Sequence, residues 1–239
     1  MIEAKNLVMR FGNRVAVDGL SFSVAKGSIV GFLGPNGAGK STTMRMLTGC
    51  LVPMAGDATI CGHDIVKDRA RAQARIGYLP EAANGFAGLT VREFLTFCGE
   101  ARGLRGAALN DAVARVAADV HLTEALERRL KELSKGWRQR AWFAQALLHD
   151  PDVLILDEPT DGLDPNQKER MRAFIRRIAA DKAILLSTHI LEEAEEICTR
   201  AIVVANGRIV ADDVPSKLAD ARGRLAPMFR TLTDGEAAR

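Results

Sequence analysis

The stretch Gly34-Pro35-Asn36-Gly37-Ala38-Gly39-Lys40-Ser41-Thr42 sets the architecture expected for this chain. It fits the pattern G-x-x-x-x-G-K-[ST], in which the backbone N–H groups of a glycine-rich loop turn towards an anion. In such loops the lysine reaches the β- and γ-phosphates of a nucleotide, and the hydroxyl after it ligates Mg²⁺. Lys40 and Ser41 occupy these positions. We therefore predict that residues 34–42 bind nucleotide phosphates.

The residues on either side of this loop predict a strand before it and a helix after it. The apolar run at residues 29–33 is typical of a buried strand, and residues 41–48 of a helix that ends at Gly49. This order places a phosphate at a helix N-terminus, where free N–H groups favour an anion. A plain glycine-rich turn is the alternative, and the strand–loop–helix context argues against it.

Composition and cysteine spacing argue against several classes of protein. The 239 residues are 47% hydrophobic, which supplies a substantial core. Aromatic residues make up 5% and the net charge is +3, so neither a base-stacking surface nor a general nucleic-acid footprint is expected. The four cysteines are scattered without paired spacing, which argues against a zinc site or a disulfide framework and is typical of reduced cytosolic chains.

No part of the sequence predicts direct insertion into a membrane. The N-terminus lacks the basic start and apolar run of a signal peptide, and no window of about 18 uninterrupted apolar residues occurs. We therefore expect a cytoplasmic protein that reaches a membrane only through a partner chain.

Periodicity predicts an α/β core interrupted by a helical insertion. Alternating apolar residues indicate antiparallel strands within residues 1–30, and residues 82–148 are predicted to be mostly helical. The core resumes with the apolar strand 153–156, and Asn206-Gly207 predicts a tight turn between two late strands. Beyond about residue 219 the pattern is weak, so a weakly structured tail is expected. The other predicted elements are strands at residues 56–62, 76–79 and 183–187 and a helix at about 167–180.

Two carboxylates, Asp157 and Glu158, follow the apolar strand 153–156. A phosphate-loop enzyme needs a carboxylate at the C-terminal end of a strand to hold Mg²⁺, and hydrolysis needs a group that deprotonates water. Asp157 is the candidate for the first role and Glu158 for the second. An Asp-Glu pair alone is a common turn element, but beside a phosphate loop the catalytic interpretation is favoured.

The segment Leu133-Ser134-Lys135-Gly136-Trp137-Arg138-Gln139-Arg140 is a second candidate anion site. Ser134 is a good helix N-cap, and Gly136 lets a ligand approach the backbone closely. Residues 127–140 contain six basic and two acidic side chains, and a helix N-terminus in a basic stretch suits an anion. By pattern alone, a capped helix with a solvated basic face explains the segment better.

Six motifs, taken in order, resemble the ATP-binding cassette (ABC) ATPase family over about residues 1–217. The signature segment, Leu133-Ser134-x-Gly136, is the most specific of these motifs, because it separates this family from other phosphate-loop NTPases. Lys135, the aromatic residue at 137 and Glu81 are similar to the subgroup that powers type-2 ABC exporters, whose membrane permease is a separate chain. The six motifs are residues 34–42, Tyr78-Leu79-Pro80-Glu81, residues 133–140, Leu156-Asp157-Glu158-Pro159-Thr160, Asp161-Gly162-Leu163-Asp164 and Ser187-Thr188-His189.

The resemblance implies an α/β fold with a RecA-like phosphate-loop NTPase core. That core would comprise residues 1–81 and 149–218 and include an N-terminal antiparallel β subdomain. A helical subdomain would be inserted at residues 82–148, and residues 219–239 would form the weakly structured tail.

The resemblance also implies the catalytic roles. Glu158 would be the catalytic base, His189 the switch residue that contacts the γ-phosphate and Glu158, and Lys40 the phosphate-binding lysine. Phe11 would stack on the adenine of ATP; an ordinary core or edge-strand phenylalanine is the alternative.

Magnesium would be held by Ser41, Asp157 and Glu81. The family usually carries Gln at the position of Glu81. A carboxylate can also ligate Mg²⁺, but its charge near the phosphates leaves the strength of the metal coupling open.

In the family, two subunits close head to tail around two ATP molecules, and each signature segment meets the partner's phosphate loop. Ser134 and Gly136 would thus bind the partner's ATP. Lys135 stands where the family commonly has Gly, and Trp137 where it commonly has Gln. Asp161 stands where Ser is common, so the contact that Asp161 makes with the partner can differ from that of the family. The implied interface consists of Leu133, Ser134, Lys135, Gly136, Asp161 and Asp164.

These expectations combine into an ATP-hydrolysing subunit of an ABC transporter, a homodimer around two MgATP that drives a separate permease in export and binds no nucleic acid. A soluble ABC ATPase acting on ribosomes or DNA is the alternative. Ribosome-acting members usually fuse two cassettes in one chain, and DNA-repair members split the cassette with long coiled coils. Here there is one cassette, and only residues 82–132 separate Glu81 from Leu133. A phosphate-loop kinase is a second alternative, against which residues 133–136 and His189 argue.

Overall fold

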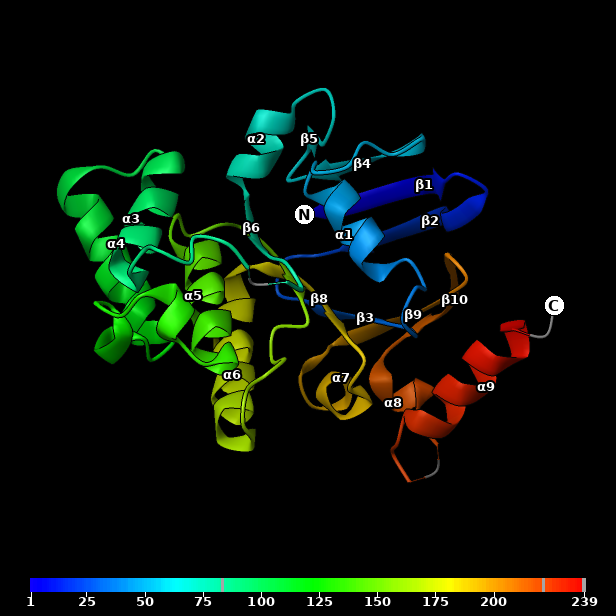
Figure 1. The fold of residues 1–239 in the computed structure, drawn as a ribbon. Helices are drawn as coiled ribbons and strands as arrows, with labels where there is room; N and C mark the ends of the chain where they lie inside the picture. The colour runs from blue at the N-terminus through cyan, green and yellow to red at the C-terminus, as the bar shows by residue number, and fades with distance from the viewer. Residues whose placement is uncertain (83, 221, 238–239) are drawn as a thin grey trace.

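The structure is a computed structural model that describes residues 1–82, 84–220 and 222–237, with side chains as far as residue 232. Figure 1 shows a small antiparallel sheet beside a larger central sheet, with a lobe of helices on one flank of the central sheet and the C-terminal helices on the other. The mixed α/β architecture, the antiparallel subdomain and the inserted helices confirm the predicted fold class.

The small sheet is built on a hairpin of β1 (Ile2–Phe11) and β2 (Arg14–Val24). β1 also pairs antiparallel with β4 (Ala55–Ile60), which pairs with the short β5 (His63–Asp64). In the second half of β2, the buried Leu20, Phe22 and Val24 alternate with exposed serines, as expected for an antiparallel strand with one face on the core. Strand β1 ends at Phe11 beside the phosphate loop, so this sheet supplies one wall of the phosphate pocket.

The central sheet has the strand order β10-β9-β3-β8-β7-β6. β6 to β9 and β3 run parallel to their neighbours, and only the pairing of β9 with β10 is antiparallel. Asn206 and Gly207 have φ of 49° and 78°, the left-handed geometry of the predicted tight turn between these two. The strands are β3 (Ile29–Leu33), β6 (Ile76–Leu79), β7 (Val153–Asp157), β8 (Ala183–Thr188), β9 (Arg200–Ala205) and β10 (Arg208–Asp213).

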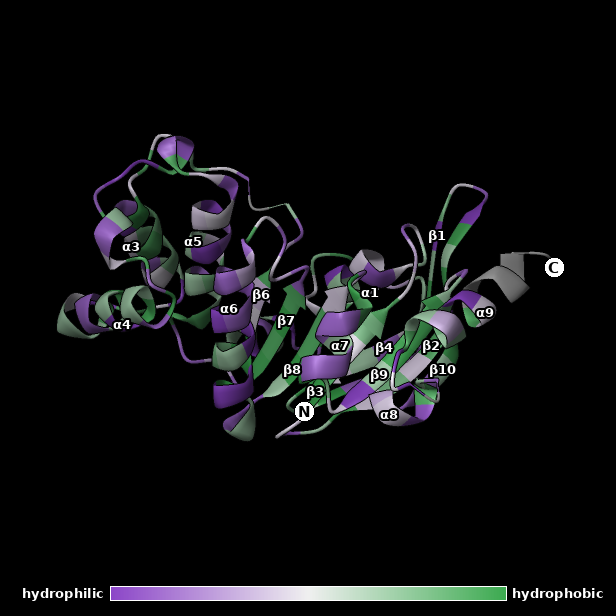
Figure 2. Ribbon diagram, turned by 90° about the horizontal axis from the view of Figure 1, so that it is seen from below, coloured by the Kyte–Doolittle hydropathy of each residue, from purple (hydrophilic) through white to green (hydrophobic). Residues whose placement is uncertain are grey.

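Both faces of the central sheet are buried, which explains the continuous apolar runs of its strands. In β7, Val153 and Ile155 pack with the small sheet and α1 (Lys40–Leu47). Leu154 and Leu156 point to the opposite face and pack with the helices there. Figure 2 shows the strands of this sheet largely hydrophobic, whereas the helices outside them carry much of the hydrophilic colour.

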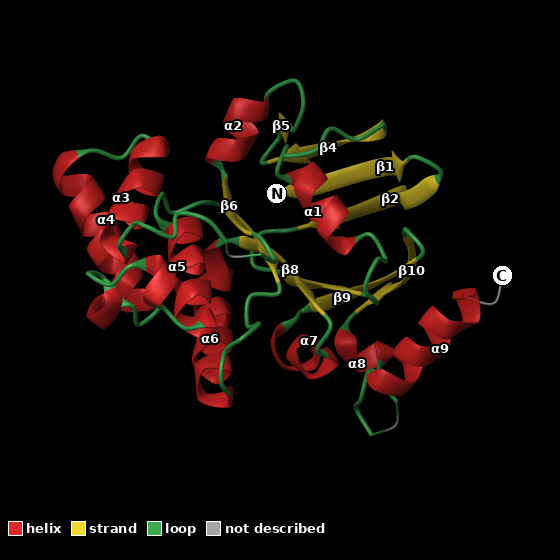
Figure 3. Ribbon diagram, viewed as in Figure 1, coloured by secondary structure: helices red, strands yellow, loops and turns green. Residues whose placement is uncertain are grey.

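The inserted lobe contains α3 (Val91–Ala101), α4 (Gly106–Asp119) and α5 (Lys135–Leu147), drawn in red at the left of Figure 3. Thr90 caps α3, since its hydroxyl accepts from the N–H of Glu93 at 3.1 Å and the Glu93 carboxylate accepts from the N–H of Thr90 at 2.7 Å. α5 lies directly on β6. A methyl group at Gly77 would come within 2.1 Å of the Ala146 carbonyl oxygen, so the glycine permits this contact.

The helix α2 (Arg69–Ala74) packs beside β5 of the small sheet. The helices that flank the central sheet are α6 (Pro165–Ile178), α7 (Leu191–Ile197), α8 (Pro215–Leu218) and α9 (Ala226–Ala237). In the described part of the chain, no helix combines the length and the apolar character that a membrane span requires.

The expectation of a weakly structured tail beyond residue 219 is wrong for its second half, because that segment forms α9. Leu225 before the helix is buried, and its N–H donates to the Glu195 carboxylate at 2.5 Å. Phe229 and Leu232 then pack on the core. This packing against distant strands stabilises a helix whose own sequence pattern is weak. Positions 221, 238 and 239 of the predicted tail lie outside the described residues.

Candidate functional site

A pocket of about 370 Å³ opens where the β1–β2 hairpin, the loop before α1 and the ends of β6 and β7 meet. It brings together most of the residues that the sequence predicts to bind or hydrolyse ATP. Gly34, Pro35 and Ala38 of the predicted loop do not line it. The lining residues are Phe11, Arg14, Ala16, Asn36, Gly37, Gly39, Lys40, Ser41, Thr42, Glu81, Asp157 and Glu158.

The loop before α1 requires its glycines. Gly39 has a φ of 107°, and a methyl group there would come within 2.4 Å of the Ala16 carbonyl oxygen. A methyl group at Gly34 would come within 2.3 Å of the Val204 carbonyl oxygen. Gly39 stands at the N-cap of α1 without a side-chain cap. The first N–H groups of this helix therefore remain available to an anion.

Lys40 lies across the loop. Its Nζ donates to the carbonyl oxygens of Gly34 at 2.7 Å and Pro35 at 3.1 Å. Burial lowers the pKa of Lys40, while Glu158, Asp157 and Glu81 act in the opposite direction. The ammonium group is therefore held at the mouth of the loop, where it can meet phosphate oxygens.

Asp157 and Glu158 stand at the C-terminal end of β7, held by the neighbouring strand. The Ser187 hydroxyl donates to the Asp157 carboxylate and accepts from the N–H of Glu158 at 3.1 Å. Glu158 has a φ of 51°, a left-handed conformation uncommon for a residue with a side chain. This backbone geometry and the contacts of Ser187 turn the two adjacent carboxylates into one pocket. The sequence places Ser187 in a motif but does not predict its role as a hydrogen-bonding partner.

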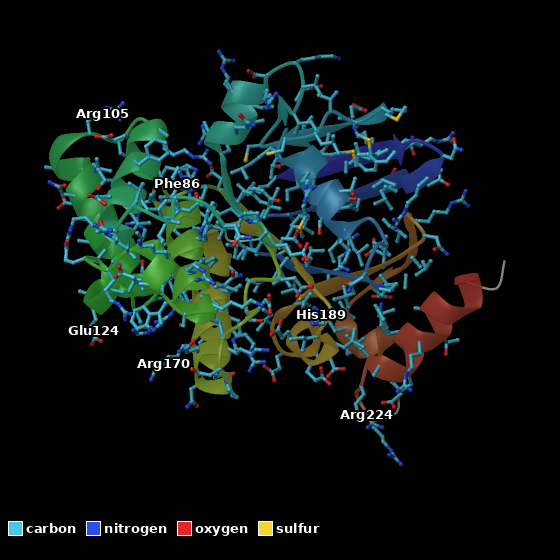
Figure 4. The ribbon with its side chains drawn as sticks, in the orientation of Figure 1. Phe86, Arg105, Glu124, Arg170, His189 and Arg224 are labelled. Atoms are coloured by element: carbon cyan, nitrogen blue, oxygen red, sulfur yellow. The ribbon has the colours of Figure 1, made fainter. Side chains whose placement is uncertain are left out.

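Glu158 has the environment of a general base. Burial raises its pKa, and the hydrogen bond with His189, the charge on His189 and Lys40 oppose that shift. Nδ1 of His189 lies 2.9 Å from Oε2 of Glu158. Figure 4 labels His189 in the loop that leads from β8 into α7. The side chain of His189 is 59% exposed and that of Glu158 is 14% exposed, so the pair bridges the pocket and its rim.

Ser41, Glu81 and Asp157 all line this pocket. The Ser41 hydroxyl lies 3.5 Å from Oε2 of Glu81. A hydroxyl and carboxylates beside a phosphate site are the ligands that Mg²⁺ prefers, so these residues fit the metal.

The signature segment lies apart from the pocket. Ser134 caps α5, since its hydroxyl accepts from the N–H of Trp137 at 3.4 Å. Gly136 packs against the loop after β7, where a methyl group would come within 3.0 Å of the Gly162 carbonyl oxygen. Gln139 donates from Nε2 to the Glu158 carbonyl oxygen at 2.9 Å. The N-terminal turn of α5 is thus attached to the loop that carries Glu158.

The residues expected at a dimer interface fall into two groups. Lys135 is exposed and Asp161 half-buried, and the two form an ion pair of 2.6 Å. Asp164 caps α6 by accepting from the N–H of Gln167 at 2.9 Å. Leu133 is only 4% exposed and packs in the hydrophobic core. Its place at an interface stays a prediction, with most of the side chain already packed within its own chain.

Sequence reasoning missed two lining residues, Arg14 and Ala16. Nη2 of Arg14 donates to the Gly37 carbonyl oxygen at 3.3 Å. Arg14 begins β2 three positions after Phe11, and a basic residue next to a candidate adenine-stacking residue is the signal that could have identified it.

Comparisons with known proteins agree on one family. The family model described as "ABC transporter" matches residues 17–161. The Nod factor export ATP-binding protein I of Paraburkholderia xenovorans is 43% identical over 221 residues, which cover 91% of this chain and 72% of that protein. The probable multidrug ABC transporter ATP-binding protein YbhF of Escherichia coli is 37% identical, over 91% of this chain and 38% of that protein. A solved ATP-binding subunit of an ABC transporter superposes with a TM-score of 0.88 at 29% identity, covering 97% of this chain and 99% of that one.

Proposed function

This chain belongs to the ABC transporter family of ATP-binding proteins, and on that premise we propose that it powers an exporter by closing as a dimer around two MgATP. It is an ATP-binding ABC ATPase, as its motifs predict. The export direction, the dimer and the permease are the parts that we propose. The relatives named for Nod factor export and for multidrug transport support the export direction.

The geometry of Glu158 carries the proposal for hydrolysis. A base must be within reach of the attacking water and ionised at the working pH. Glu158 lines the phosphate pocket, its pKa is raised by burial, and His189 donates to its carboxylate. In this proposal Glu158 accepts the proton of the water, Lys40 binds the phosphates and His189 orients Glu158 towards the γ-phosphate.

Magnesium would be held by Ser41, Asp157 and Glu81, and when bound it neutralises charge that develops on the β- and γ-phosphates. Asp157 is oriented for this role by the Ser187 hydroxyl. Phe11, which is 54% exposed at the edge of the pocket, would stack on the adenine.

The position of the signature segment supports a dimer. Ser134 and Gly136 do not line the pocket of their own chain. In a head-to-tail homodimer they would complete the partner's site, and the ion-paired Lys135 and Asp161 would lie at the contact.

A second cavity supports docking of the permease between the inserted helices and the core. It has a volume of about 700 Å³ and lies where the end of α1, α2, β6 and the end of α3 converge. Tyr78, three residues before Glu81, lines it, so an occupant would be close to the nucleotide site. We propose that the permease binds there and thereby holds the chain on the cytoplasmic face of the membrane.

The first test is ATP hydrolysis by the full chain with Mg²⁺, compared with Glu158→Gln. We expect the variant to lose turnover, keep ATP binding and accumulate an ATP-dependent dimer detectable by light scattering. Glu192→Gln, an exposed carboxylate on α7, is the matched control and should behave like the parent chain. Undiminished hydrolysis by Glu158→Gln would contradict the assignment of the base. A phosphorylated small-molecule product would instead support a kinase.

A further inference from the structure

A buried carboxylate outside the pocket connects the two segments that carry the candidate catalytic residues. Glu193, on α7, is 2% exposed. Its Oε2 accepts from the Thr188 hydroxyl at 2.9 Å, and its Oε1 accepts a short hydrogen bond from the Thr160 hydroxyl. Thr160 and Thr188 are themselves fully enclosed. Nζ of Lys168 lies 4.0 Å from Oε1.

The donors around Glu193 suit an ionised carboxylate. Each of its oxygens receives a hydroxyl proton, as an acceptor-only group requires. The Thr188 hydroxyl oxygen accepts from the N–H of Ile190 at 3.0 Å, which leaves its own proton for Glu193. Burying a charge is costly, and an apolar side chain of similar size is often better for stability. A role in stability alone therefore does not explain the choice of a glutamate here.

The two threonines stand close to the catalytic candidates in the sequence, but neither threonine lines the phosphate pocket. Thr188 directly precedes His189, and Thr160 follows Glu158 by two positions. On the pocket side, Ser187 and His189 contact Asp157 and Glu158 directly. Outside the pocket lining, Glu193 joins the same two chain segments through Thr160 and Thr188. The end of β8 is therefore attached to the end of β7 on both sides.

We propose that Glu193 is a positioning residue for ATP hydrolysis, holding the His189 loop and the Glu158 loop at a fixed separation through Thr188 and Thr160. Glu193 touches no nucleotide, because it does not line the phosphate pocket. A displacement of about 1 Å at a catalytic group can lower a rate about a hundredfold. Removing either threonine hydroxyl should therefore lower kcat without weakening ATP binding. This inference rests on the proposed roles of Glu158 and His189.

The test uses near-isosteric changes, which remove the hydrogen bond to Glu193 and leave the packing largely in place. At position 188 the change also removes the hydrogen bond from the N–H of Ile190. Thr160→Val and Thr188→Val, made in the full chain, should each lower kcat about tenfold or more, while the KM and the equilibrium Kd for ATP change less than about twofold. Thr160→Ser and Thr188→Ser keep the hydroxyl and should restore most of the rate. The double Val variant should be little worse than the poorer single one, because both act through one carboxylate.

Glu193→Gln and the control Glu195→Gln complete the set. Glu195 lies on the same helix but accepts from the N–H of Leu225, far from the two loops, so its substitution should leave kcat unchanged. Glu193→Gln keeps the shape but offers only one acceptor oxygen, and its kcat should be lowered as in the Val variants.

Full activity in both Val variants, or equal losses of kcat and ATP affinity, would overturn the inference. Glu158→Gln distinguishes a failure of the proposed function from a failure of the role proposed for Glu193. If it stays active, the proposed function fails; if it is inactive while the Val variants are normal, only Glu193 loses its role.

Discussion

Nζ of Lys135 lies 2.6 Å from a carboxylate oxygen of Asp161. Each residue replaces a smaller, neutral one that is common in the family, Gly in the first case and Ser in the second. The lysine stem also lies over Gly162, whose φ is 74° and where a methyl group would come within 2.6 Å of the Cδ of Lys135. The two departures thus compensate each other, on the surface where we expect a second subunit.

Separating this pair should affect the dimer more than the fold. Lys135→Gly or Asp161→Ser alone leaves an unpaired charge at the expected contact, and we expect each to weaken ATP-dependent dimerisation severalfold. The double variant should recover most of it. The folded chain should change by at most about 1 kcal/mol, because exposed ion pairs contribute little. Light scattering in the Glu158→Gln background measures the dimer. Two single variants that dimerise like the parent would refute this, and Arg92→Ala, which breaks an exposed pair in the helical lobe, is the control.

The pH dependence of hydrolysis should move when His189 is removed. Glu158 must be ionised to act as a base, so activity is lost as the pH falls through its pKa. Burial raises that pKa, and the hydrogen bond from His189 and its charge lower it. In His189→Ala the pKa of Glu158 should rise further, and the acidic limb of the kcat profile should shift to higher pH. His63→Ala, whose ring contacts Asp68 instead, should leave the limb in place. A lower rate with an unmoved limb would mean that His189 does not act through Glu158.

The exposed ring of Phe11 should contribute to nucleotide affinity. Phe11→Ala removes a stacking surface worth about 1 kcal/mol, so the Kd for ATP should rise severalfold to about tenfold. Phe11→Trp should retain the affinity of the parent. Phe97 is similarly exposed but lies on α3, away from the pocket, and Phe97→Ala should bind ATP normally. Fluorescence titration with a nucleotide analogue measures each Kd, and equal affinities in the Ala and Trp variants would exclude stacking by Phe11.

Acid should destabilise the fold in part through His149. Burial, with a contribution from Arg102, lowers its pKa from 6.5 to about 4. Its Nε2 contacts the Ile76 carbonyl oxygen at 3.1 Å. Between these two pKa values the unfolded chain binds a proton that the folded chain does not. The free energy of unfolding therefore decreases as the pH falls through this window, by about 2 kcal/mol between pH 7 and pH 5.

Urea unfolding at pH 7 and pH 5 measures this effect. His149→Gln should reduce the difference in stability between the two pH values, whereas His121→Gln, at an exposed turn, should not. An unchanged difference in His149→Gln would show that other groups cause the acid sensitivity.

Much of the site follows from short segments read in isolation. The loop at residues 34–42, the strand before Asp157 and the N-cap Ser134 each depend on interactions between residues within a few positions of one another. Such local geometry is specified by glycines, apolar runs and capping side chains. The pairing of β9 with β10 through Asn206-Gly207 was predictable for the same reason.

Other features depend on contacts that no local pattern encodes. The side chain of Leu133 packs in the core, which its motif alone does not indicate. Ser187 and Glu193 acquire their roles only because β8 lies beside β7 and α7 folds back against both segments. Residues 226–237 form a helix because α9 packs against β9 and β10. In these cases the stabilising partners are distant in sequence, so their free energy becomes available only when the sheet has formed.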